Sequence, residues 1–324
     1  MPIRAIARRA IPSRSNLHTP LSRGYDDLKN LSHLQRLESE AIHILRDGVA
    51  QAENPVLLFS GGKDSTVLAH LARKAFYPAQ PPLSLLHVDS TWEFADVLAF
   101  RDAFAKAHGF RLEVYRNEEG FRQGLNPVDH GAYYTTNMRT EALKHALDRG
   151  GYDVIFGGAR RDEEGVRAKE RIVSVRDTGH GWDPKNQRPE LWSLYNWRCA
   201  KGQSIRAFPL SNWTEQDLWT YIITQRIALC PLYFAKPRRV TLHKGKVIVV
   251  DEPDRAKQWG WTVSQTLNVR FRSLGCWPVT GAQASDADTM EGVFLETLKT
   301  DRSERGGRIA DGKSLEEQKR QGYF

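Results

Sequence analysis

Short apolar runs alternate with amphipathic segments along residues 33–158, and this alternation constrains the fold more than any other feature of the sequence. Runs of strand length lie at 55–59, 83–88, 111–116 and 152–158. Apolar residues with helical spacing fill 33–50, the stretch after residue 65, 93–108 and 138–149. Such alternation is typical of a parallel sheet flanked by helices. We therefore predict an α/β protein with a twisted, Rossmann-like parallel sheet.

Polar segments follow each of the predicted strands. They read SGGKDS at 60–65, DST at 89–91, RNEEG at 116–120 and GGARRDEE at 157–164. Because the carboxyl ends of parallel strands meet at one edge of a sheet, where a crevice forms, these segments are expected to line a common ligand site.

The second half of the chain is less regular. SIRAFPL at 204–210 predicts a strand, Thr214 to Asp217 predicts a helix start, VTLH and KVIVV predict a hairpin around 244–245, and 286–299 predicts a helix. We divide the chain into a basic arm at 1–28, an α/β domain at 29–228 and an irregular C-terminal extension at 229–324.

Charge and composition exclude several classes of protein. Residues 1–23 contain five arginines and no acid, and so supply five of the eight net positive charges of the 324-residue chain. The rest is only mildly basic, which argues against a nucleic-acid partner, and the arm is interpreted as a disordered extension or a transit peptide. No apolar run approaches the roughly 18 residues of a membrane span.

Cysteine occurs only at Cys199, Cys230 and Cys276, without a paired spacing. This usage favours a reducing, cytoplasmic location and argues against a cysteine-ligated metal site supplied by this chain alone. The tryptophans crowded between 192 and 277 are interpreted as core or interface residues.

The segment Ser60–Ser65 has the composition of a phosphate-binding loop. Gly61 and Gly62 allow a close approach of backbone N–H groups, Lys63 adds a positive charge, and a helix is expected to begin directly afterwards. The pattern departs from the common G-x-x-x-x-G-K-[ST] loop because Asp64 follows the lysine. A carboxylate beside phosphates indicates either Mg²⁺ brought in with a nucleotide or helix capping.

The segment 156–172, FGGARRDEEGVRAKERI, is either a solvated charged surface or an anion site. Its place directly after a predicted strand favours a site. Arg160, Arg161 and Arg167 are the candidate ligands of a small tetrahedral anion, because a guanidinium donates two parallel hydrogen bonds.

The loop SGGKDS resembles that of the ATP pyrophosphatase superfamily, which cleaves ATP between the α- and β-phosphates. Further stretches, among them LLHVDSTWEF, FGGARRDEEGVRAKERI, WDPKNQRPELW, FPLSNWTEQDLW, VRFRSLGCWPVTGA and KRQGYF, resemble the small subunits of bacterial sulfate adenylyltransferases over about residues 30–324. The first 25 or so residues have no counterpart in that pattern, and 251–262 departs from it.

This resemblance implies an adenine nucleotide alpha hydrolase-like fold and the reaction of ATP with sulfate to give adenosine 5′-phosphosulfate and pyrophosphate. It implies a GTPase large subunit as partner, with GTP acting there, Mg²⁺ arriving with ATP and no tightly bound organic cofactor. It further implies that 229–324 serves as a lid over the nucleotide and as a docking region.

The resemblance also implies roles for individual residues. Lys63, Asp64, Arg160 and Arg161 would be catalytic. ATP would contact Ser60, Gly61, Gly62, Lys63, Asp64, Ser65, Asp89, Gly157 and Gly158, with Asp89 near the nucleoside. Substitution of Lys63 or Arg161 is expected to abolish activity without unfolding, because neither is predicted to lie in the core.

Sulfate carries no proton at neutral pH, so the reaction needs no general base, and His87 and His130 are interpreted as structural. Three alternatives stay open. A sulfonucleotide reductase would need a cysteine near the C-terminus, which KRQGYF lacks. A DNA-modifying relative would need a four-cysteine cluster, and a catalytically silent regulatory subunit would not need the intact loops.

Overall fold

The computed structural model describes residues 32–243, 245–299 and 320–322, and its centre is a six-stranded sheet. The strands are β1 (Pro55–Leu58), β2 (Ser84–Asp89), β3 (Leu112–Arg116), β4 (Val154–Phe156), β5 (Val173–Arg176) and β6 (Ser204–Ala207). Their order is β3-β2-β1-β4-β6-β5, and all neighbours are parallel except β5 and β6. The predicted α/β class with a mostly parallel sheet is confirmed.

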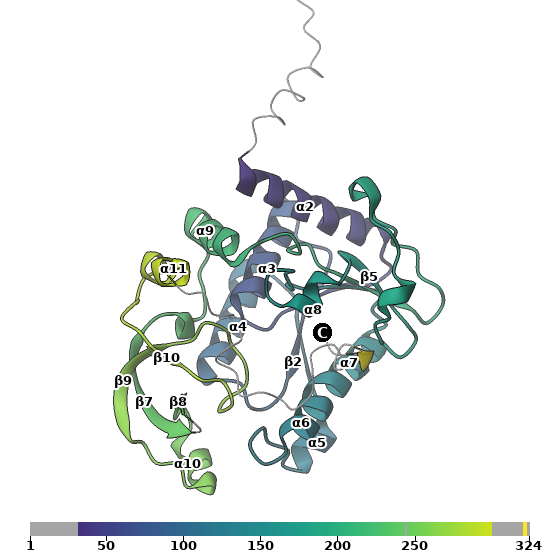
Figure 1. The fold of residues 1–324 in the computed structure, drawn as a ribbon. Coiled ribbons are helices and arrows are strands. Elements are labelled where there is room, and N and C mark those ends of the chain that lie inside the picture. Colours follow the sequence, from purple (N-terminus) through teal and green to yellow (C-terminus); the bar gives the residue numbers. More distant parts are fainter. Residues whose placement is uncertain (1–31, 244, 300–319, 323–324) are drawn as a thin grey trace, which may run out of the picture.

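Helices cover both faces of this sheet (Figure 1). They are α2 (His33–Gln51), α3 (Lys63–Phe76), α4 (Ala95–His108), α5 (Glu118–Arg122), α6 (Gly131–Thr135), α7 (Ala142–Gly150), α8 (Gly165–Ala168) and α9 (Glu215–Gln225). Side chains on one face of the strands, such as Leu57, pack with α2, α3 and α4. Their neighbours on the other face, such as Val56 and Ile155, pack against α7.

Local signals in the sequence set most helix boundaries. Ser32 and Gln35 form a capping box at the start of α2, and Thr214 and Asp217 form one at the predicted start of α9. The segment predicted as one helix at 138–149 instead starts with a π-helical turn, Thr136–Glu141, that continues into α7. The helix ends at Gly150, one residue beyond the predicted end, and its left-handed cap is Gly151 with φ of 62°.

A second, four-stranded sheet lies in the C-terminal part, beside α9 and α11 in Figure 1. It consists of β7 (Lys236–His243), β8 (Lys246–Val249), β9 (Gln265–Arg270) and β10 (Gln283–Ala284) in the order β10-β9-β7-β8. The hairpin β7–β8 confirms the prediction, whereas β9 and β10 were not foreseen. Two helices, α10 (Pro253–Ala256) and α11 (Met290–Leu298), complete this part.

Short 3₁₀ turns occupy Pro184–Asn186, Leu191–Ser193, Pro231–Tyr233 and Lys257–Trp259. One hydrophobic core joins residues on both sides of the predicted boundary at 228, and that division stays a prediction. Trp213, Trp219 and Trp277 are fully buried in this core, whereas Trp192 is exposed. None of the helices that the structure describes could cross a membrane. The predicted basic arm lies outside the described residues.

Candidate functional site

The site lies where the strand order of the main sheet changes direction. From β1 the chain proceeds to β2 and β3 on one side, while β4 and β6 lie on the other side. Open α/β sheets bind ligands at the carboxyl ends of the strands that flank this point. Here those ends carry the two segments singled out from the sequence, SGGKDS after β1 and GGARRDEE after β4.

The two segments touch each other. A Cβ placed on Gly158 would lie only 2.9 Å from the backbone carbonyl carbon of Asp64, so this approach requires glycine. On the other side, Gly61 turns the first loop with φ of +74°, a left-handed conformation that glycine adopts without strain.

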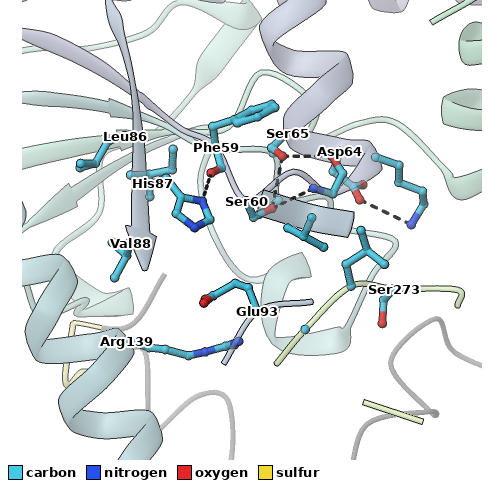
Figure 2. A pocket seen from close by; sticks show the side chains of 18 of the residues that line it. Phe59, Ser60, Asp64, Ser65, Leu86, His87, Val88, Glu93, Arg139 and Ser273 are labelled. Carbon is cyan, nitrogen blue, oxygen red and sulfur yellow. Dashed lines mark hydrogen bonds and ion pairs between the residues drawn. The ribbon is translucent and has the colours of Figure 1, made fainter. Parts of the chain in front are cut away.

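A cavity of about 270 Å³ opens at this junction (Figure 2). Its lining contains seven residues predicted as ligands: Ser60, Gly62, Lys63, Asp64, Ser65, Gly158 and Arg167. Five other predicted residues, Gly61, Asp89, Gly157, Arg160 and Arg161, lie outside the lining. The Asp89 carboxylate accepts the Thr91 N–H at 2.8 Å.

The lining also includes residues that the sequence did not single out as ligands. They are chiefly Glu93, Arg139, Glu163, Tyr233 and residues 273–275, together with His87, which was interpreted as structural. Tyr233 and 273–275 come from the C-terminal part of the chain, so distant segments complete the cavity. A lid role for that part stays a prediction.

The phosphate-type loop leads directly into α3, which begins at Lys63 and has Gly62 at its N-cap. The Ser65 and Thr66 hydroxyls both donate to the Gly62 carbonyl, at 3.0 and 2.8 Å. The Lys63 backbone N–H donates to the Tyr233 hydroxyl at 2.8 Å. The positive end of a 14-residue helix therefore lies at the cavity, an arrangement that favours anion binding.

The Lys63 side chain is buried, with 1% of its surface exposed, which contradicts the expectation that it lies outside the core. The lysine begins a helix whose first turn packs beneath the loop, and its ammonium lies 3.5 Å from the Asp64 carboxylate. A buried ammonium needs a negative partner, and it would also strengthen the attraction of the site for phosphate.

Asp64 does not cap the helix, because the N-cap Gly62 has no side-chain hydrogen bond and the aspartate lies in the first turn. Its carboxylate instead accepts a hydrogen bond from Arg160 Nε at 2.6 Å. Burial alone would raise the pKa of this carboxyl, but the charges and hydrogen bonds of Lys63 and Arg160 outweigh burial and lower the pKa to about 2. Asp64 is therefore ionised at neutral pH.

The three candidate arginines lie in three different environments. Arg160 is fully buried and, besides contacting Asp64, lies 3.6 Å from Asp162. Arg167 lines the cavity and pairs with Glu163 at 3.0 Å.

Arg161 is the most exposed of the three, with 33% of its side-chain surface accessible. It donates to the Asn212 side chain and lies 3.8 Å from Glu190, outside the cavity lining. Of the three, Arg167 is the one placed to meet an anion within the cavity.

The described residues contain no group of three or more histidine, cysteine or acidic side chains that could hold a metal ion. Asp64 is the one acidic side chain of the phosphate-type loop itself. Mg²⁺ commonly binds through one or two carboxylates together with substrate phosphates. The residues present therefore fit a magnesium ion carried by a nucleotide.

Cys276 is buried. Arg139 Nη2 lies 2.6 Å from its sulfur, and the hydroxyls of Tyr134 and Ser90 lie at 3.1 and 3.2 Å. Because Arg139 also lines the cavity, the cysteine supports its wall.

Comparisons with known proteins give consistent results. A family model described as "Phosphoadenosine phosphosulfate reductase domain" matches residues 54–282. Sulfate adenylyltransferase subunit 2 of Proteus mirabilis is 56% identical over 298 residues, which cover 91% of this chain and 98% of that protein. The protein of the same name from Hyphomonas neptunium is 53% identical over 319 residues, 97% of each chain.

Among solved structures, Candida glabrata FMN adenylyltransferase is similar at 14% identity with a TM-score of 0.46. That match covers 88% of this chain and 93% of the other. A similarity of this size carries no argument about activity.

Proposed function

The chain belongs to the sulfate adenylyltransferase subunit 2 family and contains a phosphoadenosine phosphosulfate reductase domain, and we propose that it transfers the adenylyl group of ATP to sulfate. The products are adenosine 5′-phosphosulfate and pyrophosphate. The observation that carries this proposal is the junction of the phosphate-type loop with the arginine-rich loop, which share one cavity wall through Asp64, Gly158 and Arg167.

The first loop suits the leaving pyrophosphate. The N-terminus of α3 lies at the cavity, where the helix dipole favours negative charge, and Lys63 adds a full positive charge. Negative charge accumulates on the β- and γ-phosphates as the α–β bond breaks. Fixed donors in a partly closed site stabilise such charge without reorganisation.

The second loop suits the acceptor. Arg167 lines the cavity, and the buried Arg160 holds Asp64, the acidic side chain of the phosphate-type loop. Sulfate needs no deprotonation, so catalysis consists of alignment with the departing pyrophosphate and neutralisation of charge. Arg160, Arg161 and Arg167 remain the candidate sulfate ligands, and the cavity lining favours Arg167.

A magnesium ion brought in with ATP would supply charge neutralisation at the phosphates. Asp64 would be its protein carboxylate, because it lies in the loop and is ionised. The ion pair with Arg160 engages one carboxylate oxygen, and the Lys63 ammonium lies 3.5 Å from the other.

The name of the relatives, subunit 2, implies a partner subunit. From the family resemblance we infer that the partner is a GTPase. The phosphosulfate anhydride formed lies uphill of the bond broken, and a coupled hydrolysis can displace the equilibrium. Three free cysteines are consistent with a reducing compartment such as the cytoplasm.

The test is pyrophosphate release from ATP by this chain co-purified with its large subunit, with and without sulfate and GTP. Release that requires sulfate and rises with GTP supports the proposal. Lys63→Gln is expected to reduce it at least a hundredfold, whereas Lys74→Gln, which removes a lysine paired with Glu38 outside the cavity, should leave it unchanged. Far-ultraviolet circular dichroism would verify that both variants fold.

Two other functions predict different results. A silent regulatory subunit would show no sulfate-dependent release while still altering GTP hydrolysis by the partner. A sulfonucleotide reductase would consume a thiol reductant, but Cys276 is buried against Arg139, Tyr134 and Ser90. Neither alternative accounts for the junction of the two loops as well as adenylyl transfer does.

A further inference from the structure

Two hydrogen-bond acceptors in the cavity wall have no partner within the described part of the chain. They are Nε2 of His87, on β2, and Oε2 of Glu93, in the turn between β2 and α4. Both atoms are shielded from solvent, and leaving such groups unpaired costs free energy. Figure 2 shows the His87 ring and the Glu93 carboxylate both directed into the cavity.

The hydrogen-bond partners of each side chain determine whether its unpaired atom can donate or accept. The His87 Nδ1 atom lies 2.9 Å from the Phe59 carbonyl oxygen, which can only accept, so Nδ1 carries the proton. Burial lowers the pKa of His87, which outweighs the opposing effect of Glu93 and keeps the ring neutral. The Nε2 atom therefore presents a lone pair to the cavity.

Glu93 is held in a similar way. Its Oε1 accepts both the backbone N–H and the hydroxyl of Ser90, the former at 3.0 Å. This double contact holds the carboxylate in place and leaves Oε2 as a second acceptor at the same wall.

The position of the pair relates it to a particular part of a nucleotide. Phe59, which His87 contacts, directly precedes Ser60, the first residue of the phosphate-type loop. Away from the loop, the lining includes the apolar residues Leu58, Leu86, Val88 and Leu143, which come from β1, β2 and α7. A nucleotide with its phosphates at the loop would thus extend its nucleoside along this wall.

We propose that His87 and Glu93 bind the nucleoside part of ATP by accepting hydrogen bonds from its donor groups. This inference depends on the proposed function only in taking ATP as the nucleotide. Phosphate oxygens at neutral pH are acceptors and cannot satisfy either atom. The donors that ATP offers are the 6-amino group of adenine and the 2′- and 3′-hydroxyls of the ribose.

The pair also predicts discrimination among nucleotides. A base with a carbonyl oxygen at position 6, as in ITP, would place an acceptor against acceptors if the amino group is the partner. A deoxyribose would leave one acceptor unpaired if a hydroxyl is the partner. A site built around such hydrogen bonds rejects ligands that lack the donor, because its buried groups then stay unpaired.

The experiment measures equilibrium binding of ATP, ITP, 2′-deoxy-ATP, 3′-deoxy-ATP and inorganic tripolyphosphate to the full chain without sulfate. The variants are Glu93→Gln, which preserves shape but replaces one acceptor with a donor, and His87→Phe, which removes the acceptor. Matched controls are Glu113→Gln, which affects a glutamate bound to Tyr152, and His70→Phe, which affects a histidine outside the lining.

We expect each site variant to weaken ATP binding on the order of tenfold while tripolyphosphate binding stays unchanged. The controls should bind both probes as the parent chain does. In the parent chain either ITP or one deoxy nucleotide should bind more weakly than ATP, and the variants should have lost that difference. Weaker binding of ITP would identify the 6-amino group as the partner, and weaker binding of a deoxy nucleotide would identify a ribose hydroxyl.

Parent-like ATP binding by both variants would overturn the inference. So would an equal loss of ATP and tripolyphosphate binding, because the pair would then act on the phosphate loop. If His87→Phe fails to fold, Glu93→Gln still decides the matter. A chain that binds ATP through this pair but releases no pyrophosphate with sulfate would contradict the proposed reaction and leave the inference intact.

Discussion

Arg160 Nε donates to the Asp64 carboxylate over 2.6 Å, and this pair joins two loops that lie 96 residues apart in the sequence. Asp64 belongs to the loop after β1, and Arg160 belongs to the loop after β4. Since Arg160 is fully buried, the contact has a structural as well as an electrostatic role. This ion pair therefore helps to hold the two halves of the candidate site together at the point where the strand order reverses.

Asp64→Asn should destabilise the protein in a pH-dependent way. The pKa of Asp64 is lowered from 3.8 to about 2 in the folded chain. A carboxyl with a lowered folded pKa contributes stability that is present above its unfolded pKa and is lost as the pH falls through the folded value. That contribution is about 2 kcal/mol at neutral pH. Denaturant unfolding of the parent chain and of Asp64→Asn between pH 7 and pH 2 measures this contribution.

The difference in unfolding free energy between parent and variant should be largest above about pH 5 and shrink between about pH 4 and pH 2. Asp254→Asn is the matched control, because Asp254 forms an exposed ion pair with Lys257. Exposed pairs of this kind contribute little to stability. A pH-independent difference for Asp64→Asn would mean that the carboxylate charge is not what holds the two loops together.

Gly158→Ala should disturb the junction directly. The new Cβ would lie 2.9 Å from the Asp64 backbone and 3.1 Å from the Ser65 nitrogen, and backbone atoms cannot move aside as a flexible side chain can. Overpacking of this kind costs about 1–3 kcal/mol. We expect a lower midpoint in thermal unfolding and a loss of ATP binding.

Gly165→Ala provides the comparison, because a Cβ at that position meets nothing within 4 Å. It should leave unfolding and ATP binding essentially unchanged. Equal behaviour of the two variants would show that the loops separate readily at Gly158.

Arg167→Ala and Arg161→Ala should have different kinetic effects. Arg167 lines the cavity, so its removal should raise the KM for sulfate on the order of tenfold or more, with little change in the KM for ATP. Arg161 contacts Asn212 and Glu190 outside the lining, so its removal should chiefly lower stability. Steady-state kinetics at varied sulfate decides between them, and a larger sulfate effect at Arg161 would return that residue to the acceptor site.

The fold could be predicted because, in each element, apolar residues recur with the period of a helix or of a strand. The apolar runs at 55–59 and 152–158 became the neighbouring strands β1 and β4, and both conspicuous loops followed at the same edge of the sheet. By contrast, β5 was missed because it carries Ser174 and Arg176. Arg176 is buried and pairs with Glu170, a contact between residues that sequence patterns treat as exposed.

The sequence predicted those parts of the site where backbone geometry restricts the residue type. It missed the parts that form where segments distant in the sequence meet. The glycines, lysine and aspartate at 60–65 indicated a phosphate-type loop. The burial of Lys63 could not be predicted in this way, because it depends on the packing of α3. Glu93 lies four residues beyond the predicted Asp89, and only the turn between β2 and α4 brings it back to the wall. No sequence pattern indicated Tyr233, because its role depends on a contact with Lys63, which lies 170 residues away in the sequence.

Tyr233→Phe tests that contact. Its hydroxyl accepts the Lys63 backbone N–H at 2.8 Å, and burial raises the pKa of the phenol, so the group stays protonated at neutral pH. Phenylalanine preserves the packing but leaves a buried N–H at the start of α3 without this acceptor, which costs about 1–3 kcal/mol. Because that N–H helps to position the phosphate-type loop, ATP binding should weaken on the order of tenfold.

Tyr221→Phe is the matched control, since its hydroxyl donates to Glu38 at 2.7 Å, outside the cavity lining. It should lower stability by about 0.5–1.5 kcal/mol and leave ATP binding unchanged. Unfolding curves and ATP titrations of both variants separate stability from binding. If Tyr233→Phe binds ATP as the parent does, the C-terminal part does not act on the loop through this hydroxyl, and its contribution to the site would reduce to the wall formed by 273–275.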